Sequence, residues 1–314
     1  MLRLKAIYSD KYDLHLGDHV FPSVKYRLIH EALLEQQLEY ELDFLEPQPA
    51  EDLDVLLVHT EEWVNKLKTG TLTPEDIYRL EIPCSPQLIR AVWLSAGGTI
   101  LAGQCALSNG IAVNIGGGFH HAFPDHGEGF CVLNDVAIAI RKIQKEGLIQ
   151  RAMTVDLDVH HGNGTAVIFA RDDSVFTFSM HQANNYPLEK PPSDLDIHLP
   201  DGCEDEPYLH LLRENLHHVL SVFHPDLIFY LAGADPYRED QLGGLSLTLE
   251  GLRERDRIVF AMARERNIPV AVTLPGGYAH NVEDTVAIHV GTIRAALEAL
   301  QLAGHLESRG EEGM

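Results

Sequence analysis

The stretch "AMTVDLDVHHGNGT" (residues 152–165) joins a short apolar run to two carboxylates and two imidazoles. An uninterrupted apolar run of this length is typical of a strand that is buried on both faces of a sheet. Asp156, Asp158 and His160 occupy alternate positions, so in an extended chain their side chains point to the same face. Burying these three groups together is costly unless another group compensates their charge. The stretch therefore predicts a buried strand that ends at a polar site.

Similar apolar runs alternate with longer segments of helical periodicity along the whole chain. The candidate strands are residues 55–58, 111–115, 153–158, 175–180, 227–231 and 270–274. The candidate helices are residues 24–40, 87–108, 134–146, 208–223, 250–266 and 284–302. Strands that alternate with helices indicate βαβ units. The sequence therefore predicts an α/β fold whose mainly parallel sheet carries helices on both faces.

No internal repeat and no mid-chain linker rich in Pro, Gly or Ser divides the 314 residues. We therefore predict a single catalytic domain over residues 1–304, followed by a polar, flexible tail over residues 305–314. No apolar stretch is long enough to span a membrane without interruption, and the N-terminus has no apolar region of the kind found in signal peptides.

The composition limits the compartment and the partners of the protein. The four cysteines (Cys84, Cys105, Cys131 and Cys203) are scattered, with no CxxC pair, as in a protein with reduced thiols. We therefore expect a cytoplasmic protein that does not associate with membranes. The net charge of −23 argues against binding to nucleic acid and favours a cationic substrate or partner.

Polar or glycine-rich residues follow five of the predicted strands, always at the carboxyl end. These segments are "GGGFHH" (116–121), "DLDVHH" (156–161), His181, "AGAD" (232–235) and "PGGY" (275–278). In open α/β sheets, ligands bind outside the carboxyl ends of the strands. We therefore expect the five segments to meet in one crevice.

The residue types at these strand ends predict a metal site. Asp158, His160 and Asp235 supply two carboxylates and one imidazole, and three protein ligands with one open position are typical of catalytic zinc. Because no sulfur ligand is present, Fe²⁺, Co²⁺ and Mn²⁺ are alternatives. The spacing alone does not decide whether Asp156 or Asp158 is the ligand, and Asp235 followed by Pro could also serve only as a turn.

Two further strand ends supply groups for acid–base chemistry. His120 and His121 follow a glycine run and could act as general base and then as general acid. Tyr278 follows two glycines and could donate its hydroxyl to a developing oxyanion. The glycines at 116–118 lack the lysine of a phosphate-binding loop, so a nucleotide site is not predicted. A metal, a base and an oxyanion donor together indicate hydrolysis of an acyl bond.

The motifs "GGGFHHA", "GFCVLND", "DLDVHHGNGT", "AGADP", "LGGLSLT" and "PGGY", in this order, resemble the histone deacetylase family. That family includes bacterial acetoin-utilisation-like and acetylpolyamine-hydrolysing members. The resemblance extends over residues 7–302, and "NNYP" and "DQLGGLSLT" are most similar to the class IV branch. It implies the arginase/deacetylase fold, a three-layer α/β/α sandwich around a parallel eight-stranded sheet.

The resemblance also implies roles for individual residues. Asp158, His160 and Asp235 match the Zn²⁺ ligands of the family, and Tyr278 matches its oxyanion donor. In the tandem histidine pair, His121 would be the proton shuttle, and His120 would act mainly through its charge.

Other positions match the surroundings of the family's site. Asp156 would support His120 and, together with Ser179 and Met180, border a K⁺ site. Gly129 and Phe130 would form the wall of an acyl-lysine tunnel, and Leu242 would lie at its rim. Many family members have a carboxylate where this chain has Asn163, and an amide would stabilise the imidazolium of His121 less.

These observations predict a metal-dependent amidohydrolase that removes an acetyl or longer fatty-acyl group from lysine side chains. The glycines around 242–244 and the segment 184–187 would lie at the tunnel mouth, and the class IV resemblance favours long acyl chains. One alternative is a hydrolase of acetylated polyamines or other small amides, which the acidic composition suits equally well. A catalytically weak scaffold that binds acyl-lysine is the less favoured alternative, because every expected catalytic position is present.

Overall fold

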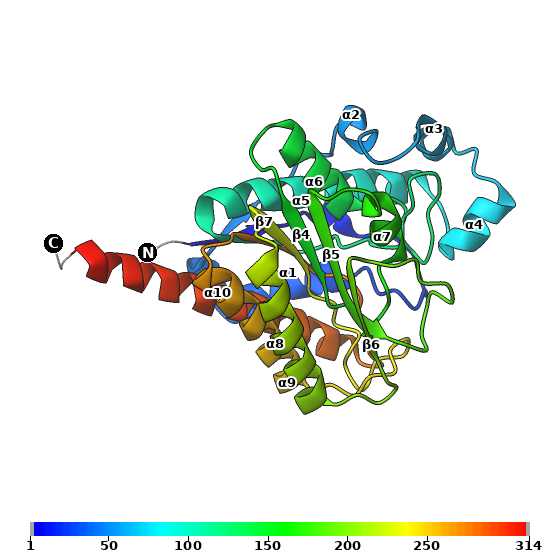
Figure 1. Cartoon of the computed structure of the whole chain (residues 1–314). Helices are drawn as coiled ribbons and strands as arrows, with labels where there is room; N and C mark the ends of the chain where they lie inside the picture. The colour runs from blue at the N-terminus through cyan, green and yellow to red at the C-terminus, as the bar shows by residue number, and fades with distance from the viewer. Residues whose placement is uncertain (1–2, 312–314) are drawn as a thin grey trace.

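The computed structural model of the chain describes residues 3–311 and is built around one eight-stranded sheet (Figure 1). The strand order is β2-β1-β3-β8-β7-β4-β5-β6, and all neighbouring pairs are parallel. The strands are β1 (Leu4–Ile7), β2 (Leu42–Leu45), β3 (Ile111–Asn114), β4 (Ala152–Asp156), β5 (Val175–Gln182), β6 (Leu195–Leu199), β7 (Leu227–Leu231) and β8 (Val270–Thr273). The predicted parallel α/β sheet is therefore confirmed.

Long helices cover both faces of the sheet. They are α1 (Lys25–Glu35), α5 (Pro86–Asn109), α6 (Asp135–Lys145), α8 (Asp205–Val222), α9 (Leu249–Glu265) and α10 (Val282–Glu311). Helices α5 and α6 pack together on one face, and α1, α8, α9 and α10 lie on the other (Figure 1). Shorter helices lie in the connections, namely α2 (Asp52–Val55), α3 (Glu61–Thr69), α4 (Pro74–Leu80) and α7 (Asn163–Phe169), with single turns of 3₁₀ helix at Asp10–Tyr12 and Leu38–Tyr40.

The central strands are buried on both faces, which explains why their sequences do not alternate between apolar and polar residues. Every residue of β3, β4, β7 and β8 is buried. Helix α5 packs against β3 and β8. By length and composition this helix could also cross a membrane, and 72 % of its most apolar window is buried inside the protein. Its sequence is not an uninterrupted apolar run, because Ser, Gly, Thr and Gln residues interrupt it.

Two sequence predictions of secondary structure need correction. Residues 55–58 do not form a strand: α2 ends at Val55, and its first turn contains Asp52 and Asp54, which suit a helix N-terminus. The strands β1, β2 and β6 were not predicted. The first two have only four residues each, and the edge strand β6 has a mixed sequence, LDIHL, that is mostly only half-buried.

Part of the predicted flexible tail belongs to the last helix, and its flexibility stays a prediction. The backbone of residues 305–311 continues helix α10, whose last residue is Glu311. Leu, Glu and Arg favour helix, and extending an existing helix avoids the cost of nucleating a new one. Residues 312–314 of the predicted tail lie outside the described residues.

Candidate active site

The five strands whose carboxyl ends carry polar residues are neighbours in the sheet. In spatial order they are β3, β8, β7, β4 and β5. Because all five are parallel, their carboxyl ends open on the same edge, as the sequence predicts. This arrangement brings four of the five predicted segments into one site, although more than a hundred residues separate the first from the last. The fifth, His181, lies within β5 and contacts Ser179 and His198 instead.

Asp158, His160 and Asp235 form a compact group that fits a divalent cation. Their nearest ligand atoms all lie within 4.8 Å of one another. His160 Nδ1 lies 3.0 Å from Asp158 Oδ1 and 3.3 Å from Asp235 Oδ2. Asp235 is fully buried, and its Oδ2 atom has no hydrogen-bond partner among the described residues. A buried carboxylate oxygen without a partner is costly, and a bound cation would compensate it.

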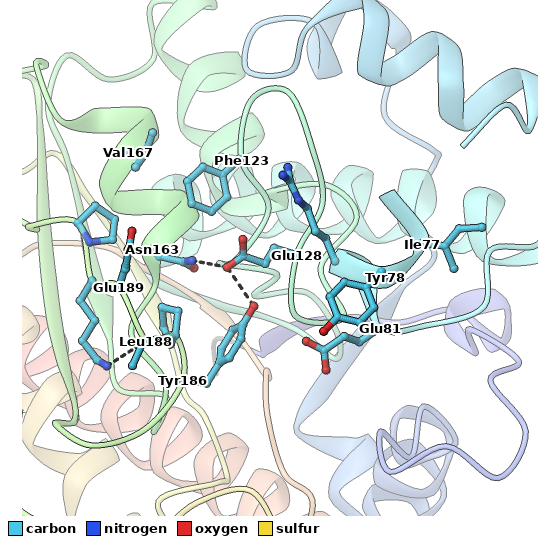
Figure 2. Close-up of a pocket in the computed structure, with 14 residues that line it drawn as sticks. Ile77, Tyr78, Glu81, Phe123, Glu128, Asn163, Val167, Tyr186, Leu188 and Glu189 are labelled. Atoms are coloured by element: carbon cyan, nitrogen blue, oxygen red, sulfur yellow. Dashed lines mark hydrogen bonds between the residues drawn. The ribbon is translucent and has the colours of Figure 1, made fainter. Parts of the chain in front are cut away.

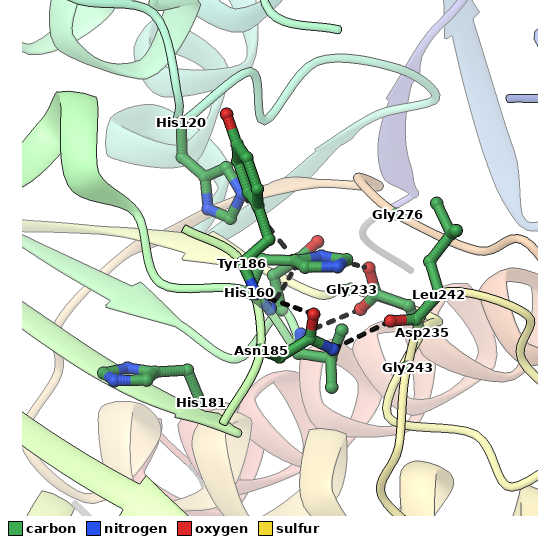
Figure 3. Close-up of polar contacts among 12 residues, drawn as sticks. His120, His160, His181, Asn185, Tyr186, Gly233, Asp235, Leu242, Gly243 and Gly276 are labelled. Atoms are coloured by element: carbon green, nitrogen blue, oxygen red, sulfur yellow. Dashed lines mark hydrogen bonds and ion pairs between the residues drawn. The ribbon is translucent and has the colours of Figure 1, made fainter. Parts of the chain in front are cut away.

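The structure separates the roles of Asp156 and Asp158, which the sequence spacing left open. Asp156 Oδ2 lies 2.7 Å from His120 Nδ1, and its Oδ1 accepts a hydrogen bond from Asp158 N. Asp156 therefore faces His120, whereas Asp158 faces His160 and Asp235 (Figure 3 shows His160 and Asp235 in contact). Of the two, Asp158 belongs to the group that could hold a cation.

Gly276 allows the chain after β8 to approach the two carboxylates. Its φ is +60°, and a Cβ atom there would lie 2.3 Å from Asp235 Oδ2 and 2.7 Å from Asp158 Oδ2. Any side chain would have to displace these groups. Gly276, the first glycine of "PGGY", is thus required by its close packing against Asp158 and Asp235.

The electrostatics of this group also favour a cation. Burial lowers the pKa of His160, but the hydrogen bond with Asp158 and the negative charges of Asp235 and Asp158 outweigh burial and raise it to about 10. Burial, followed by repulsion from Asp158, raises the pKa of Asp235. The same two carboxylates that hold a proton on His160 would attract a metal ion.

His120 and His121 are adjacent in sequence but have opposite electrostatic environments. Burial lowers the pKa of His120, yet the charges of Asp156 and Asp158 outweigh it and raise the pKa to about 9. Burial lowers the pKa of His121 well below its usual range, and His120 and His160 lower it further. His120 is therefore suited to carry a positive charge, and His121 is suited to be a neutral base.

A buried carboxylate holds the turn that leads to the histidine pair. Asp135, at the start of α6, accepts hydrogen bonds from the backbone N–H groups of Gly118 and Phe119. The hydroxyl of Thr99 donates to the same carboxylate. The glycine run predicted to approach the crevice is thus anchored to two helices.

Tyr278 lies beside the Asp158, His160 and Asp235 group. Its backbone is held by Asp240, a residue to which the sequence analysis assigned no role. The Tyr278 ring centroid lies 6.3 Å from that of His160. Its backbone N–H donates to Asp240 Oδ2 at 2.7 Å, and Asp240 Oδ1 accepts from the backbone of Leu242 and Gly243. Asp240 lies directly before "QLGGLSLT", so its position beside a motif was available as an indication.

A small cavity of about 20 Å³ lies between these groups. Its lining residues are Phe21, Tyr26, Gly117, Gly118, Phe119, His120, His121, Gly129, Phe130, Cys131, Asp158, His160, Pro275, Gly276 and Tyr278. Gly129 and Phe130 thus lie where the sequence analysis predicted a tunnel wall. Leu242 does not line the cavity, but its carbonyl accepts from Asn185 Nδ2 at 2.8 Å, close to Tyr186 (Figure 3).

The predicted K⁺ site remains a prediction. Asp156 and Ser179 are paired across β4 and β5, and Met180 follows in the same strand. A second group that could hold a metal, His161, His181 and Asp196, lies next to them. Both ring nitrogens of His181 lie within hydrogen-bond distance of other side chains, at Ser179 and His198.

Two buried cations near the site were also not predicted. Lys25 Nζ donates to the carbonyl of Gly276. Burial lowers the pKa of Lys25 to about 8, although the charges of nearby carboxylates act to raise it. Arg255 Nη1 donates to the carbonyl of Gly233 at 2.6 Å and pairs with Asp256. Both residues lie on helices, α1 and α9, and helical periodicity predicts which face is buried but not the contacts of its side chains. A charged residue on the buried face is unusual, and this was the feature of the sequence that could have identified them.

The fold of the chain is shared with a solved deacetylase domain. It superimposes on the crystal structure of the HDA15 HD domain with a TM-score of 0.81, covering 95 % of this chain and 90 % of that one at 23 % identity. The likeness establishes the arginase/deacetylase type of fold.

Sequence comparisons identify the family. Residues 19–293 match the family described as "Histone deacetylase domain". The chain is 46 % identical to an uncharacterized protein of Picosynechococcus sp., over 89 % of this chain and 93 % of that protein. It is 31 % identical to Histone deacetylase 2 of Arabidopsis thaliana (98 % and 81 % covered) and 33 % identical to a probable deacetylase of Archaeoglobus fulgidus (87 % and 80 % covered). The chain belongs to the histone deacetylase family and is a deacetylase-type hydrolase.

Proposed function

We propose that the protein is a Zn²⁺-dependent lysine deacylase that removes an acetyl group from lysine side chains. The observation that carries the proposal is the convergence of three kinds of group on one buried cavity. These are the carboxylate–imidazole group of Asp158, His160 and Asp235, the neutral base His121, and the hydroxyl of Tyr278. Each supplies a different requirement of amide hydrolysis.

Asp158, His160 and Asp235 would hold the metal. When bound there, a divalent ion supplies Lewis-acid polarisation of the amide carbonyl and lowers the pKa of water beside it. The donor set contains no sulfur, so Fe²⁺ and Co²⁺ are the competing ions.

The side chains of the chain itself would move the protons. Neutral His121 accepts a proton from the attacking water and returns it to the departing amine. Tyr278 donates its hydroxyl to the oxygen that becomes negative as water adds. His120, held positive by Asp156, stabilises the negative charge that develops nearby.

A positively charged product suits the charge of the chain. The free amine of lysine is cationic, and the net charge of −23 would attract a lysine-rich peptide from a distance. An acetylated polyamine has the same advantage and remains the alternative substrate class.

The test compares the two substrate classes on the Zn²⁺-loaded protein. We expect a higher kcat/KM on an acetyl-lysine peptide than on N-acetylspermidine, with both activities lost in Tyr278→Phe. A higher value for N-acetylspermidine would replace the lysine assignment by the polyamine assignment. Lack of turnover of either substrate by protein with a full complement of metal would overturn the hydrolase assignment in favour of a binding scaffold.

A further inference from the structure

We infer that Glu128 is a positioning residue that sets the proton arrangement of His121 through the side-chain amide of Asn163. This inference rests on the proposed function, because it assigns Glu128 a part in the work of the general base. The observation behind it is a continuous chain of hydrogen bonds that leads from the base to a carboxylate outside the cavity.

The contacts in this chain are short and direct. His121 Nδ1 lies 2.7 Å from Asn163 Oδ1, and Asn163 Nδ2 donates to Glu128 Oε1 at 2.6 Å. His121 and Asn163 are buried, with exposed fractions of 5 % and 2 %, so the inner contact is shielded from bulk solvent. Glu128 is partly exposed and lies on the wall of a surface groove of about 930 Å³ (Figure 2).

The chemistry of the three groups fixes the direction of every hydrogen bond. An ionised carboxylate only accepts, so the amide must present its NH₂ group to Glu128. The oxygen of Asn163 must then face His121, where it can only accept. His121 consequently carries its proton on Nδ1 and leaves Nε2 free to act as a base. Without a carboxylate at position 128, the side-chain amide of Asn163 could present either its oxygen or its NH₂ group to His121.

Glu128 is itself held in place by two further contacts. Tyr186 OH donates to the same Oε1 atom at 3.0 Å, and the Tyr186 ring packs against the His121 ring with centroids 5.0 Å apart. Glu128 and Cys131 exchange backbone hydrogen bonds around a turn whose central residues both have positive φ, Gly129 at +51° and Phe130 at +68°. The tunnel-wall turn therefore also positions the carboxylate.

Glu128 stays ionised in this setting. Burial raises its pKa, but hydrogen bonds from His126, Asn163 and Tyr186 outweigh burial and lower the pKa below its usual range. The resemblance implies a carboxylate at position 163 in many relatives. In this chain the negative charge instead lies one side chain farther out, at Glu128.

The experiment uses the metal-free protein first, so that its outcome does not depend on catalysis. Nitrogen-15 NMR of histidine-labelled protein reports which ring nitrogen of His121 carries the proton, with His121→Gln identifying the resonance. We expect the Nδ1–H form in the wild type and a mixture of both forms in Glu128→Gln. An unchanged His121 spectrum in Glu128→Gln would overturn the inference.

Kinetics of the Zn²⁺-loaded protein then test the consequence. Glu128→Gln should lower kcat about tenfold, on the scale of supporting hydrogen bonds, and leave KM within about twofold. Glu189→Gln is the matched control, because it removes the same charge from the same groove without contacting Asn163. A change in KM alone would assign Glu128 to binding in the groove instead.

A double variant keeps the test decisive if a single change disturbs folding. Asn163→Asp alone would place two carboxylates in contact and lower kcat. Adding Glu128→Gln removes that repulsion and puts the charge directly on His121, so the double variant should recover kcat to within about threefold of the wild type. Simple additivity of the two losses would overturn the inference. If no acylated amine is turned over while the NMR prediction holds, the proposed function fails and the positioning role stands.

Discussion

Asp240 and Tyr278 are joined by a hydrogen bond in which the Tyr278 backbone N–H donates to Asp240 Oδ2 at 2.7 Å. The other oxygen of Asp240 accepts the backbone N–H groups of Leu242 and Gly243, each at 2.9 Å. One buried carboxylate thus orients both the predicted oxyanion donor and the loop at the predicted tunnel mouth. The contact with Tyr278 could not be inferred from spacing, because 38 positions separate the two residues.

The first prediction follows from this contact. Asp240→Asn preserves the size of the side chain, but its NH₂ group cannot accept a hydrogen bond, so at least one backbone N–H loses its partner. Leaving a buried backbone N–H without its acceptor costs about 1–3 kcal/mol, and if Tyr278 shifts as a result kcat should fall roughly tenfold or more. Steady-state kinetics at saturating Zn²⁺ measure this. Wild-type kcat in the variant would show that Tyr278 is oriented by other contacts.

The second prediction concerns the hydroxyl of Tyr278. Tyr278→Phe removes only that group and should reduce kcat by roughly 10²- to 10³-fold, the range for a lost oxyanion donor. Metal content and the melting temperature should stay close to those of the wild type, because the ring still packs in place. A loss of less than about threefold, far below that range, would make Tyr278 a packing residue.

The third prediction distinguishes the proposed metal ligand Asp235 from the supporting carboxylate Asp156. Asp235→Ala removes a proposed ligand, and elemental analysis after dialysis should find a clear loss of bound Zn²⁺. Asp156→Asn should retain the metal but lower kcat, because the Asp156 side chain contacts His120 and the backbone N–H of Asp158, not a proposed ligand atom. Full metal content in Asp235→Ala would exclude Asp235 as a ligand.

The fourth prediction revises the expected preference for long acyl chains. The cavity between His121 and Tyr278 measures about 20 Å³, and a single water already needs roughly 10–15 Å³ on this measure. An acetyl group needs the least rearrangement, so we expect a higher kcat/KM for acetyl-lysine than for a long-chain acyl-lysine peptide. The reverse order in a chain-length series would show that the cavity opens and would support the class IV-like expectation.

The fifth prediction concerns stability and is independent of the metal. His59 is buried and accepts a hydrogen bond from the backbone N–H of Asn134, and burial lowers its pKa to about 4. Unfolding restores the ordinary pKa of about 6.5, so the unfolded chain binds the proton first as the pH falls. Between pH 7 and pH 5 this group should remove about 2 kcal/mol from the free energy of unfolding.

His59→Gln is the control for that measurement, because an amide oxygen can accept the same hydrogen bond without titrating. Denaturant unfolding at both pH values should show a smaller decrease for the variant than for the wild type. Equal decreases would mean that other groups cause the acid sensitivity.

The local sequence determined the central strands and the long helices of this protein. The runs at residues 111–115 and 227–231 are apolar throughout because both faces of their strands are buried, and that property is visible without the rest of the fold. The polar residues directly after each run also indicated the edge of the sheet that carries the site. The edge strand β6 was not predicted, because it is only partly buried and its sequence therefore mixes apolar and polar residues.

The tertiary structure alone decided which groups touch. Asp156 is the last residue of β4, and Asp158 lies two residues beyond it. Only their tertiary contacts distinguish them: Asp156 contacts His120, whereas Asp158 contacts His160 in the group that includes Asp235. Likewise, Glu128 and Asn163 are 35 positions apart and meet only because a turn of the chain packs against the start of α7. Hydrogen bonds and charges act over a few ångströms of space, whereas sequence patterns report burial over a few residues of chain.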